Sequence, residues 1–353
     1  MVAQGGVAVV LHGLCALMAP ALAFAGLSLG GPWLFLPLAW LALLSAGLDM
    51  ALPADHGRAV NREATGAALL TWTIFPIMAA LLLYALAVMT AAPHAWWEWL
   101  GAATAVGISI GGVGIPAAHE LVHRKEAWER GLGVAIVSLV LYAHFRIEHV
   151  HGHHRTVGTT DDPATARFGH SLYRFMTISV PGEVTSAWRL EVERLARRGV
   201  PLFHWRNRML WYIALQAGLV AGAYALFGTA GLLFFLGQAA VAILLLQATA
   251  YIEHYGLERG RSPRGGWERI EPWHSWNSAH RMTNLATFNL GLHAEHHRWP
   301  GKAYPELVDD RLARHLPFGY ATMIGLALVP PLWFRVMNPL VRAEAEAAPA
   351  AAE

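Results

Sequence analysis

The chain has 353 residues, of which 55% are hydrophobic and 14% charged, whereas soluble domains are usually about 45–50% apolar and about 25% charged. A formal net charge of +2 gives no indication of a nucleic-acid partner. The single cysteine, Cys15, excludes an internal disulfide and any four-cysteine iron–sulfur cluster in this chain. The composition predicts one membrane-embedded unit, which must draw electrons for any redox chemistry from another protein.

Six apolar runs are candidates for membrane spans, each of which needs about 20 residues. They lie roughly at 7–29, 32–48, 66–91, 96–118, 209–227 and 230–251. Two shorter runs, 131–145 and 319–336, are expected to be buried, re-entrant or interfacial helices. We therefore predict an all-α integral membrane fold with about six transmembrane helices. One domain is expected over 1–340, followed by a disordered Ala/Glu/Pro tail at 341–353.

The placement of basic residues predicts the topology. No Lys or Arg separates the first run from the second, the third from the fourth, or the fifth from the sixth. The loop 49–65 carries Arg58 and Arg62, and the segments 119–208 and 252–318 are rich in arginine. The positive-inside bias therefore puts the N-terminus and these segments in the cytoplasm, where the two long ones are expected to form a helical cap.

Nine of the 19 histidines form four clusters, each where an apolar run ends. The clusters are His119 and His123; His149, His153 and His154; His254; and His293, His296 and His297. All four map to the predicted cytoplasmic side. This agreement also indicates that the run 131–145 does not cross, because a span there would separate the clusters on its two sides by about 30 Å.

The spacing within the clusters indicates metal binding, because residues three or four apart lie on one face of a helix. His119 and His123 are expected to bind one ion, and His149 and His153 to do the same, while His154 turns towards a second ion. Nine imidazoles divided as four and five leave coordination positions open for oxygen and substrate. Imidazole suits iron, zinc, copper and nickel, and redox-inert zinc fits an apolar substrate poorly, so iron is expected.

Further polar residues near the clusters are expected to orient the imidazole rings through their N–H groups. They are Glu120, Glu148, Glu253, Glu295, Asp161, Asp162 and His274. His151 lies one position past the ligand face and is not expected to bind metal. No separate protein acid or base is assigned.

The clusters and their flanks closely resemble those of the integral-membrane alkane 1-monooxygenases, members of the histidine-rich membrane desaturase and hydroxylase superfamily. The shared motifs are H-E-L-V-H, E-H-x-H-G-H-H followed by T-x-D-D-P-A-T-A-R, Y-I-E-H-Y-G-L, H-S-W-N-S and L-x-x-H-A-E-H-H. The match covers roughly residues 30–340. Three departures stand beside the clusters, namely His151, Glu295 in place of the usual Asp, and Arg298-Trp299.

The resemblance implies a bacterial inner-membrane enzyme whose nine cluster histidines hold two non-haem iron ions. It implies that O2 is used to hydroxylate the terminal carbon of a medium-chain alkane. It further implies that rubredoxin, served by a rubredoxin reductase, delivers the electrons. The departures leave room for a xylene-type aromatic-methyl monooxygenase, and a fatty-acyl desaturase is a second alternative within the superfamily.

Two further hypotheses concern the channel for the substrate and the docking surface for the electron donor. An alkane is selected by shape and apolar burial, at about 0.8 kcal/mol per methylene, and Trp40 and Trp72 are predicted to line its channel. We predict that an acidic rubredoxin docks on a basic segment of the chain. The competing explanation for the positive charge of this segment is contact with anionic membrane lipid. The predicted docking residues are Arg189, Arg194, Arg197 and Arg198.

Two alternatives come from another class, namely a metal transporter and a haem-binding membrane protein. A transporter would place its histidines within the spans at mid-depth, whereas these clusters lie at span ends. Haem needs only one or two axial histidines.

Overall fold

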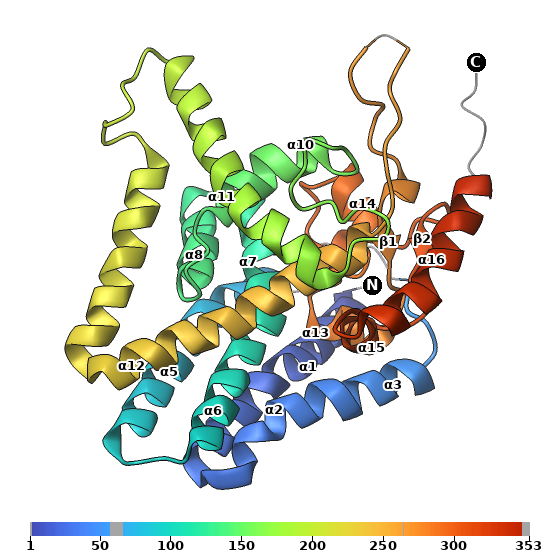
Figure 1. Cartoon of the computed structure of the whole chain (residues 1–353). Helices are drawn as coiled ribbons and strands as arrows, with labels where there is room; N and C mark the ends of the chain where they lie inside the picture. The colour runs from blue at the N-terminus through green and yellow to red at the C-terminus, as the bar shows by residue number, and fades with distance from the viewer. Residues whose placement is uncertain (1, 57–65, 264, 348–353) are drawn as a thin grey trace.

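The computed structural model describes residues 2–56, 66–263 and 265–347, and helices dominate it (Figure 1). Among these residues, five helical stretches are long and apolar enough to cross a bilayer. They contain α1 (Val2–Leu29), α2 (Leu36–Ala39) with α3 (Ala46–Ala51), α5 (Ala67–Ala91), α6 (Trp96–Ser109) with α7 (Ile115–Val122), and α12 (Arg208–His254). The predicted all-α multi-pass membrane fold is confirmed. Arg58 and Arg62 of the predicted basic loop lie outside the described residues.

Helix α12 consists of two limbs that meet at Gly228, where φ is 65° and ψ is −166°. Glycine adopts a positive φ without the Cβ clash that other residues meet. Figure 1 shows the two limbs leaving this point in different directions, at the end of the bundle opposite α10 and α14. The break lies between the two runs predicted at 209–227 and 230–251.

The α6–α7 helix is the most enclosed candidate span, and a π-helical turn at Ile110–Gly114 joins its two parts. It packs closely on α12. A Cβ added at Gly107 would lie 2.5 Å from the Cβ of Val241, and one at Gly111 would lie 3.0 Å from the Cα of Ala242. Small residues allow such close approach between membrane helices. The contact fixes the end of α7 beside the end of α12.

The segments that follow these span ends form a cap on one side of the bundle (Figure 1). Its helices are α8 (Ala127–Ser138), α9 (Phe145–Glu148), α10 (His154–Thr156), α11 (Leu172–Ala196), α13 (Arg281–Ala286) and α14 (His293–Arg298). Two short parallel strands, β1 (Trp276–Asn277) and β2 (Arg314–His315), pair within it. Helix α8 has 12 residues, which is too short to cross a bilayer.

The run predicted at 319–336 contains α15 (Tyr320–Ala327) and the start of α16 (Pro330–Ala347), two helices bent by 117°. A bend of this size suits a re-entrant or interfacial segment, which remains a prediction. Helix α16 continues to Ala347, so residues 341–347 are helical where a disordered tail was predicted. Val341 packs in a buried cluster and Glu344 pairs with Arg314, which explains the difference. Residues 348–353 lie outside the described residues.

Asp49, at the end of the second span, holds the cap to the membrane bundle. Its buried carboxylate accepts hydrogen bonds from the backbone N–H of Met282 at 2.6 Å and of Thr283 at 3.1 Å, and from the Thr283 hydroxyl at 2.7 Å. These donors lie in the first turn of α13, whose N–H groups have no partner within the helix. The same Thr283 hydroxyl oxygen accepts the backbone N–H of Tyr320.

Glu191 joins α11 to the start of α12. Its buried carboxylate accepts hydrogen bonds from Arg194 Nε at 2.7 Å and from Arg208 at 2.7 Å. Burial alone would raise the pKa of Glu191, but the hydrogen bonds from the two arginines outweigh this and hold the pKa at about 2.

The Glu191 ion pairs predict a pH dependence of stability. Because the folded pKa of about 2 lies below the ordinary value of 4.5, the stabilisation is complete above pH 4.5 and is lost as pH falls towards 2. The difference in melting temperature between the wild type and Glu191→Gln in detergent should therefore shrink as pH is lowered below 4.5. A difference that stays constant through this range would contradict the assignment.

Candidate metal centre

All nine cluster histidines converge in two adjacent groups. The first contains His119, His123, His149, His154 and His296, and the second contains His153, His254, His293 and His297. Within each group the potential ligand nitrogens lie within 4.8 Å of one another. Nitrogens on opposite sides of one ion, with bonds of about 2.1 Å, are about 4.2 Å apart. Each group therefore has close to the dimensions that a single metal ion requires.

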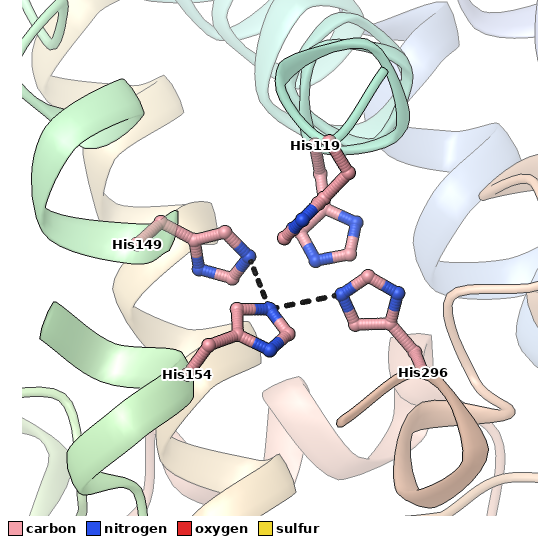
Figure 2. A group of neighbouring side chains, drawn as sticks. His119, His149, His154 and His296 are labelled. Carbon is pink, nitrogen blue, oxygen red and sulfur yellow. Dashed lines mark hydrogen bonds between the residues drawn. The ribbon is translucent and has the colours of Figure 1, made fainter. Parts of the chain in front are cut away.

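Different elements supply the two groups. Helix α7 carries His119 and ends at Val122, and the C-cap residue His123 keeps a helical backbone, so these two histidines, four apart, share a face. In Figure 2 His149 and His154 approach from the segment on the left, and His296 approaches from α14 on the opposite side. The second group receives the last residue of α12, His254, and two further residues of α14. Helix ends at one edge of the bundle thus meet in one place.

The assignment of His149 and His153 to one ion is wrong. Residues His149–His153 form a π-helical turn, in which hydrogen bonds join residues five apart rather than four. His149 consequently shares a face with His154, and their Nε2 atoms are 3.0 Å apart. His153 turns to the second group. Gly152 permits this packing, since a Cβ there would lie 2.7 Å from Glu148 Oε1.

The histidine nitrogens face one another in a way that suits a cation between them. Nε2 of His154 lies 3.0 Å from Nε2 of His149 and 3.1 Å from Nε2 of His296. Burial lowers the pKa of all three well below the ordinary value, which favours neutral rings with free lone pairs. Nε2 of His119 and of His123 are buried and have no hydrogen-bond partner among the described residues. A metal ion between the rings would bind these nitrogens, so the donor set fits a metal cofactor of the kind that imidazole ligands hold.

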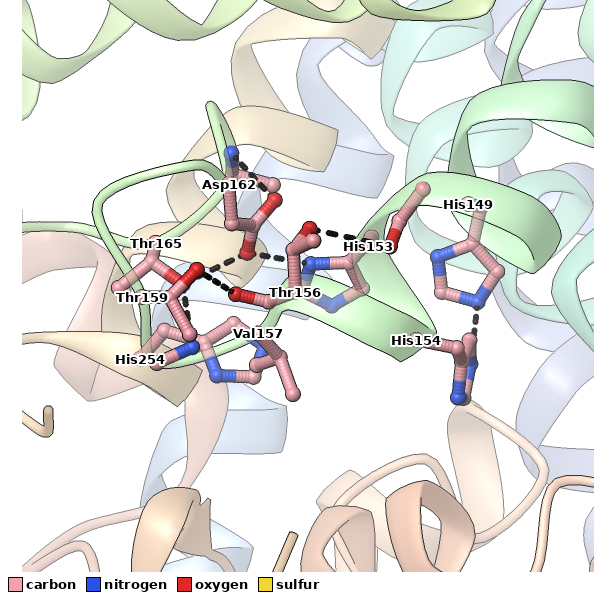
Figure 3. A network of polar contacts seen from close by, with 12 residues as sticks. His149, His153, His154, Thr156, Val157, Thr159, Asp162, Thr165 and His254 are labelled. Carbon is pink, nitrogen blue, oxygen red and sulfur yellow. Dashed lines mark hydrogen bonds and ion pairs between the residues drawn. The ribbon is translucent and has the colours of Figure 1, made fainter. Parts of the chain in front are cut away.

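Two of the predicted orienting carboxylates lie beside imidazoles. Asp162 Oδ2 is 2.9 Å from Nδ1 of His153 and also accepts the hydroxyl of Thr165 at 2.6 Å (Figure 3). A carboxylate on Nδ1 leaves Nε2 available for a metal and fixes the ring orientation. Glu253 Oε2 lies 3.4 Å from Nε2 of His293, and the hydroxyl of Tyr320 donates to Glu253 Oε1 at 2.6 Å.

The other predicted orienting residues contact the surrounding segments. Glu120 pairs with Arg124 at 2.6 Å, and Arg124 also donates to the carbonyl oxygen of Lys302. The carboxylate of Glu295 accepts hydrogen bonds from the ammonium group of Lys302 and from the backbone N–H of Val308. Asp161 accepts the indole N–H of Trp267 at 3.1 Å, and His274 lies 3.1 Å from Glu268. Glu148 is buried, and this burial raises its pKa well above the usual range.

A small cavity of about 60 Å³ borders both histidine groups, and His119, His149, His153 and His293 are among the residues that line it. A second cavity, of about 80 Å³, extends between the spans and shares Gly111, Pro116, Thr249 and Leu290 with the first as lining residues. Together they mark a mainly apolar path from the membrane bundle to the histidines.

Of the two predicted channel residues, Trp40 lines the second cavity, but Trp72 does not line either cavity. The indole N–H of Trp72 donates to Glu129 at 2.8 Å, and its ring packs edge-on against Trp128 with centroids 4.7 Å apart. Trp72 therefore joins α5 to α8, and its predicted channel role is wrong. Hydropathy alone does not reveal which face of a span a tryptophan occupies.

The sequence reasoning missed a buried polar group on the cavity wall. Glu183 on α11 lines the inner cavity and accepts hydrogen bonds from Tyr142 at 3.1 Å and from Gln247 at 2.9 Å. Burial raises the pKa of Glu183 to about 7. Because Glu183 begins a stretch, residues 183–198, in which charged residues interrupt apolar ones at helical spacing, the sequence alone does not distinguish it from a solvated glutamate.

The predicted docking arginines differ in their surroundings. Arg194 is held by Glu191 and also donates to the carbonyl oxygen of Arg206. Arg197 lies 3.8 Å from Glu193, and Arg189 and Arg198 are exposed. Arg194 is therefore not available for docking as predicted.

This fold and this site define a histidine-box membrane protein. Residues 94–327 match the family model described as fatty acid desaturase. The chain is 40% identical to alkane 1-monooxygenase 2 of Pseudomonas aeruginosa over 88% of its own length and 84% of that protein. It is 42% identical to alkane 1-monooxygenase 1 of the same organism, over 78% and 72% of the two lengths.

The chain belongs to the alkane 1-monooxygenase family. It is therefore a membrane-bound oxidoreductase that hydroxylates alkanes, and its histidine groups form a site able to bind metal. The xylene/toluene monooxygenase hydroxylase component of Pseudomonas putida is more distant, at 27% identity over 63% of this chain and 59% of that protein.

The carboxylate beside His153 generates a prediction about metal affinity. Asp162→Asn should weaken metal retention by about 10–100-fold, because the ring loses its charged hydrogen-bond partner. Metal content after dialysis against graded chelator measures the effect. The neighbouring Asp161→Asn is the matched control and should retain wild-type content, since Asp161 contacts Trp267. Equal losses in both variants would contradict the assignment.

Proposed function

We propose that the two histidine groups hold two iron ions, with His119, His123, His149, His154 and His296 at one and His153, His254, His293 and His297 at the other. The observation that carries the proposal is that nine imidazoles from separate segments, eight of them on buried residues, form two compact groups, and that members of both groups line one small cavity. When bound, the iron ions would supply the O2 activation that hydroxylation of an alkane requires. The substrate class proposed is medium-chain alkanes, oxidised at the terminal carbon to 1-alkanols.

The protein's own residues bind and position the hydrocarbon. An alkane offers no hydrogen-bonding group, so only apolar burial and shape select it. Trp40, Ile108 and Leu245 line the outer cavity among the spans, and Leu246 and Leu290 line the inner one. A chain extended through both cavities would present its terminal methyl group to the histidine groups. The apolar walls also exclude water from the reacting carbon.

Electrons must come from outside, because the chain has one cysteine and no iron–sulfur cluster can be built from it. We propose that rubredoxin, reduced by its reductase, is the donor. The arginine-rich cap segments support a location of the cap in the cytoplasm, with the enzyme in a bacterial inner membrane. The histidine groups are built from these arginine-rich segments, which supports delivery of electrons by a soluble carrier on the same side.

The iron assignment predicts that replacing a metal-binding histidine lowers the iron content, whereas replacing a neighbouring histidine does not. His296→Ala and His297→Ala each remove a nitrogen from a different group, so each should lower bound iron and abolish O2-dependent formation of 1-octanol from octane. His151→Ala should retain iron, because His151 belongs to neither group. Iron quantification and product analysis on purified protein test this. Full iron content in both alanine variants would sink the proposal.

The cavity walls predict a change in chain-length preference. Trp40→Ala enlarges the outer cavity, so longer alkanes should gain about 0.8 kcal/mol of binding for each additional buried methylene. Competition assays with alkanes of different length measure the preference. Trp72→Phe is the control and should leave it unchanged, because Trp72 packs against Trp128 outside the cavities. An unaltered preference in Trp40→Ala would contradict the channel assignment.

A further inference from the structure

Hydroxylation of an alkane by O2 consumes protons as well as electrons. One molecule of O2, one alkane R–H, two electrons and two protons give the alcohol R–OH and one molecule of water. The electrons come from the external donor, whereas the protons must reach the place where oxygen is reduced. Among the described residues, no carboxylate or cationic side chain lines the outer cavity, so the path of the hydrocarbon is a poor route for protons.

We propose that Glu183 is the acid that donates one of these protons in the inner cavity, to the oxygen atom that leaves as water, and that a solvent-filled cavity beside α11 returns the proton. The O–H bond of the Glu183 carboxyl group breaks and an O–H bond of the water molecule forms. Glu183 is then a carboxylate until a solvent proton binds to it. This inference rests on the proposed function, which supplies the place at which O2 is reduced.

Glu183 stands at the wall of the inner cavity without belonging to either histidine group. Its side chain is buried, and the lining of the same cavity includes His149 and His293, one member of each group. The hydrogen-bond partners of Glu183 are Tyr142 and Gln247, which also belong to neither group. A proton on Glu183 therefore lies beside the small volume that both groups border.

A hydrogen-bond network fixes the orientation of this carboxyl group. The hydroxyl of Tyr142 donates to Oε2 at 3.1 Å, and Nε2 of Gln247 donates to Oε1 at 2.9 Å. Gln247 also donates to the hydroxyl oxygen of Tyr142 at 3.0 Å and accepts the hydroxyl of Ser179. Each oxygen of Glu183 thus accepts one hydrogen bond and keeps a lone pair on which a proton can bind.

Titratable groups on neighbouring segments interact with this carboxyl group. They are Tyr142, Glu148, His153 and Asp162. Burial raises the pKa of Glu183 to about 7, although the hydrogen bonds from Gln247 and Tyr142 lower it. An acid whose pKa lies near the working pH is protonated often enough to donate and releases its proton readily.

A larger cavity, of about 350 Å³, brings solvent to the same turn of α11. Its exposed lining residues are Thr160, Asp161, Arg167 and Arg189. Gly182 and Ser186 line it too, on either side of Glu183 in the helix. Ser186 is buried, and its hydroxyl interacts with Glu148 on the wall of the inner cavity. The two cavities therefore meet α11 within one helical turn, which gives solvent protons a short route to Glu183.

The test replaces Glu183 by glutamine, which has nearly the same shape but no acidic proton. The iron-loaded protein in nanodiscs is reduced chemically, freed of excess reductant and mixed with O2 and octane for one turnover, so that no carrier protein takes part. Glu183→Gln should slow the formation of 1-octanol by about 100-fold or more, while Glu193→Gln, the same change at an exposed position of α11, should stay within about twofold of wild type. An unchanged rate in Glu183→Gln would overturn the proposal.

The pH dependence distinguishes a proton donor from a structural residue. Only the protonated form of Glu183 donates, so the wild-type rate should be constant below pH 7 and fall as pH rises through about 7. Glu183→Gln should lack this fall, and Glu183→Asp should restore it together with part of the rate. A fall of the same size in Glu183→Gln would contradict the assignment.

Iron content and melting temperature separate proton donation from folding. Both should match the wild type in Glu183→Gln, and a loss of iron from this variant would assign Glu183 a structural role and count against the proposal. If Glu183→Gln does not fold, Glu183→Asp decides. A folded aspartate variant with the wild-type pH profile supports the proposal, and one without it removes the proposal.

Infrared absorption gives a readout that needs no turnover. The difference between the spectra of the wild type and Glu183→Gln should contain a carboxylic acid band that disappears as pH rises through about 7. Absence of this band below pH 7 would overturn the proposal. The proposed function fails separately, if the wild type forms no 1-octanol at any pH. Formation of 1-octanol by the wild type and by Glu183→Gln at equal rates leaves that function standing and removes only the role of Glu183.

Discussion

The arrangement of buried imidazoles around two small volumes is the constraint on which the rest of the structure depends. In each group one histidine Nε2 faces two others at 3.0–3.1 Å, and because a neutral ring nitrogen carries either one hydrogen or one lone pair, it can form a hydrogen bond with only one of them. Buried polar atoms without partners cost free energy, and cations at these two positions remove that cost. Because the ligand candidates come from α7, the π-helical turn, α12 and α14, the centre also joins segments that are distant in the sequence.

The membrane bundle and the cap supply the rigidity that such a centre needs. Close packing at Gly107 and Gly111 fixes the ends of α7 and α12 relative to each other. Asp49 then anchors the first turn of α13, which begins 12 residues before His293. Hydrogen bonds from Thr165 to Asp162 and from Tyr320 to Glu253 hold the carboxylates that approach the rings. Each ligand group therefore has a second layer of contacts that restricts its motion.

The sequence predicted the parts of this structure that depend on composition and position. Apolar runs of span length and histidines at their ends were enough to predict the bundle and the place of the site. Membership in the two groups was not predictable at His149 and His153, because a 3.6-residue period was assumed where the backbone forms a π-helical turn. Trp72 and Arg194 were misjudged for a similar reason, since their partners Glu129 and Glu191 are distant or unremarkable in sequence.

The π-helical turn sets an upper limit on the length of the short segment from His149 to His154. Removing one residue between them would place the two histidines four positions apart, the spacing that shares a face in an ordinary α-helix, so the pair could keep its ligand group without the π-helical turn. Inserting one residue would place them six positions apart, on different faces of the helix, and would disturb the first ligand group. The loop that follows, residues 157–171, is free of this restriction except at Asp162 and its neighbours. Insertions among natural relatives should accordingly be absent from the first stretch and tolerated in parts of the second.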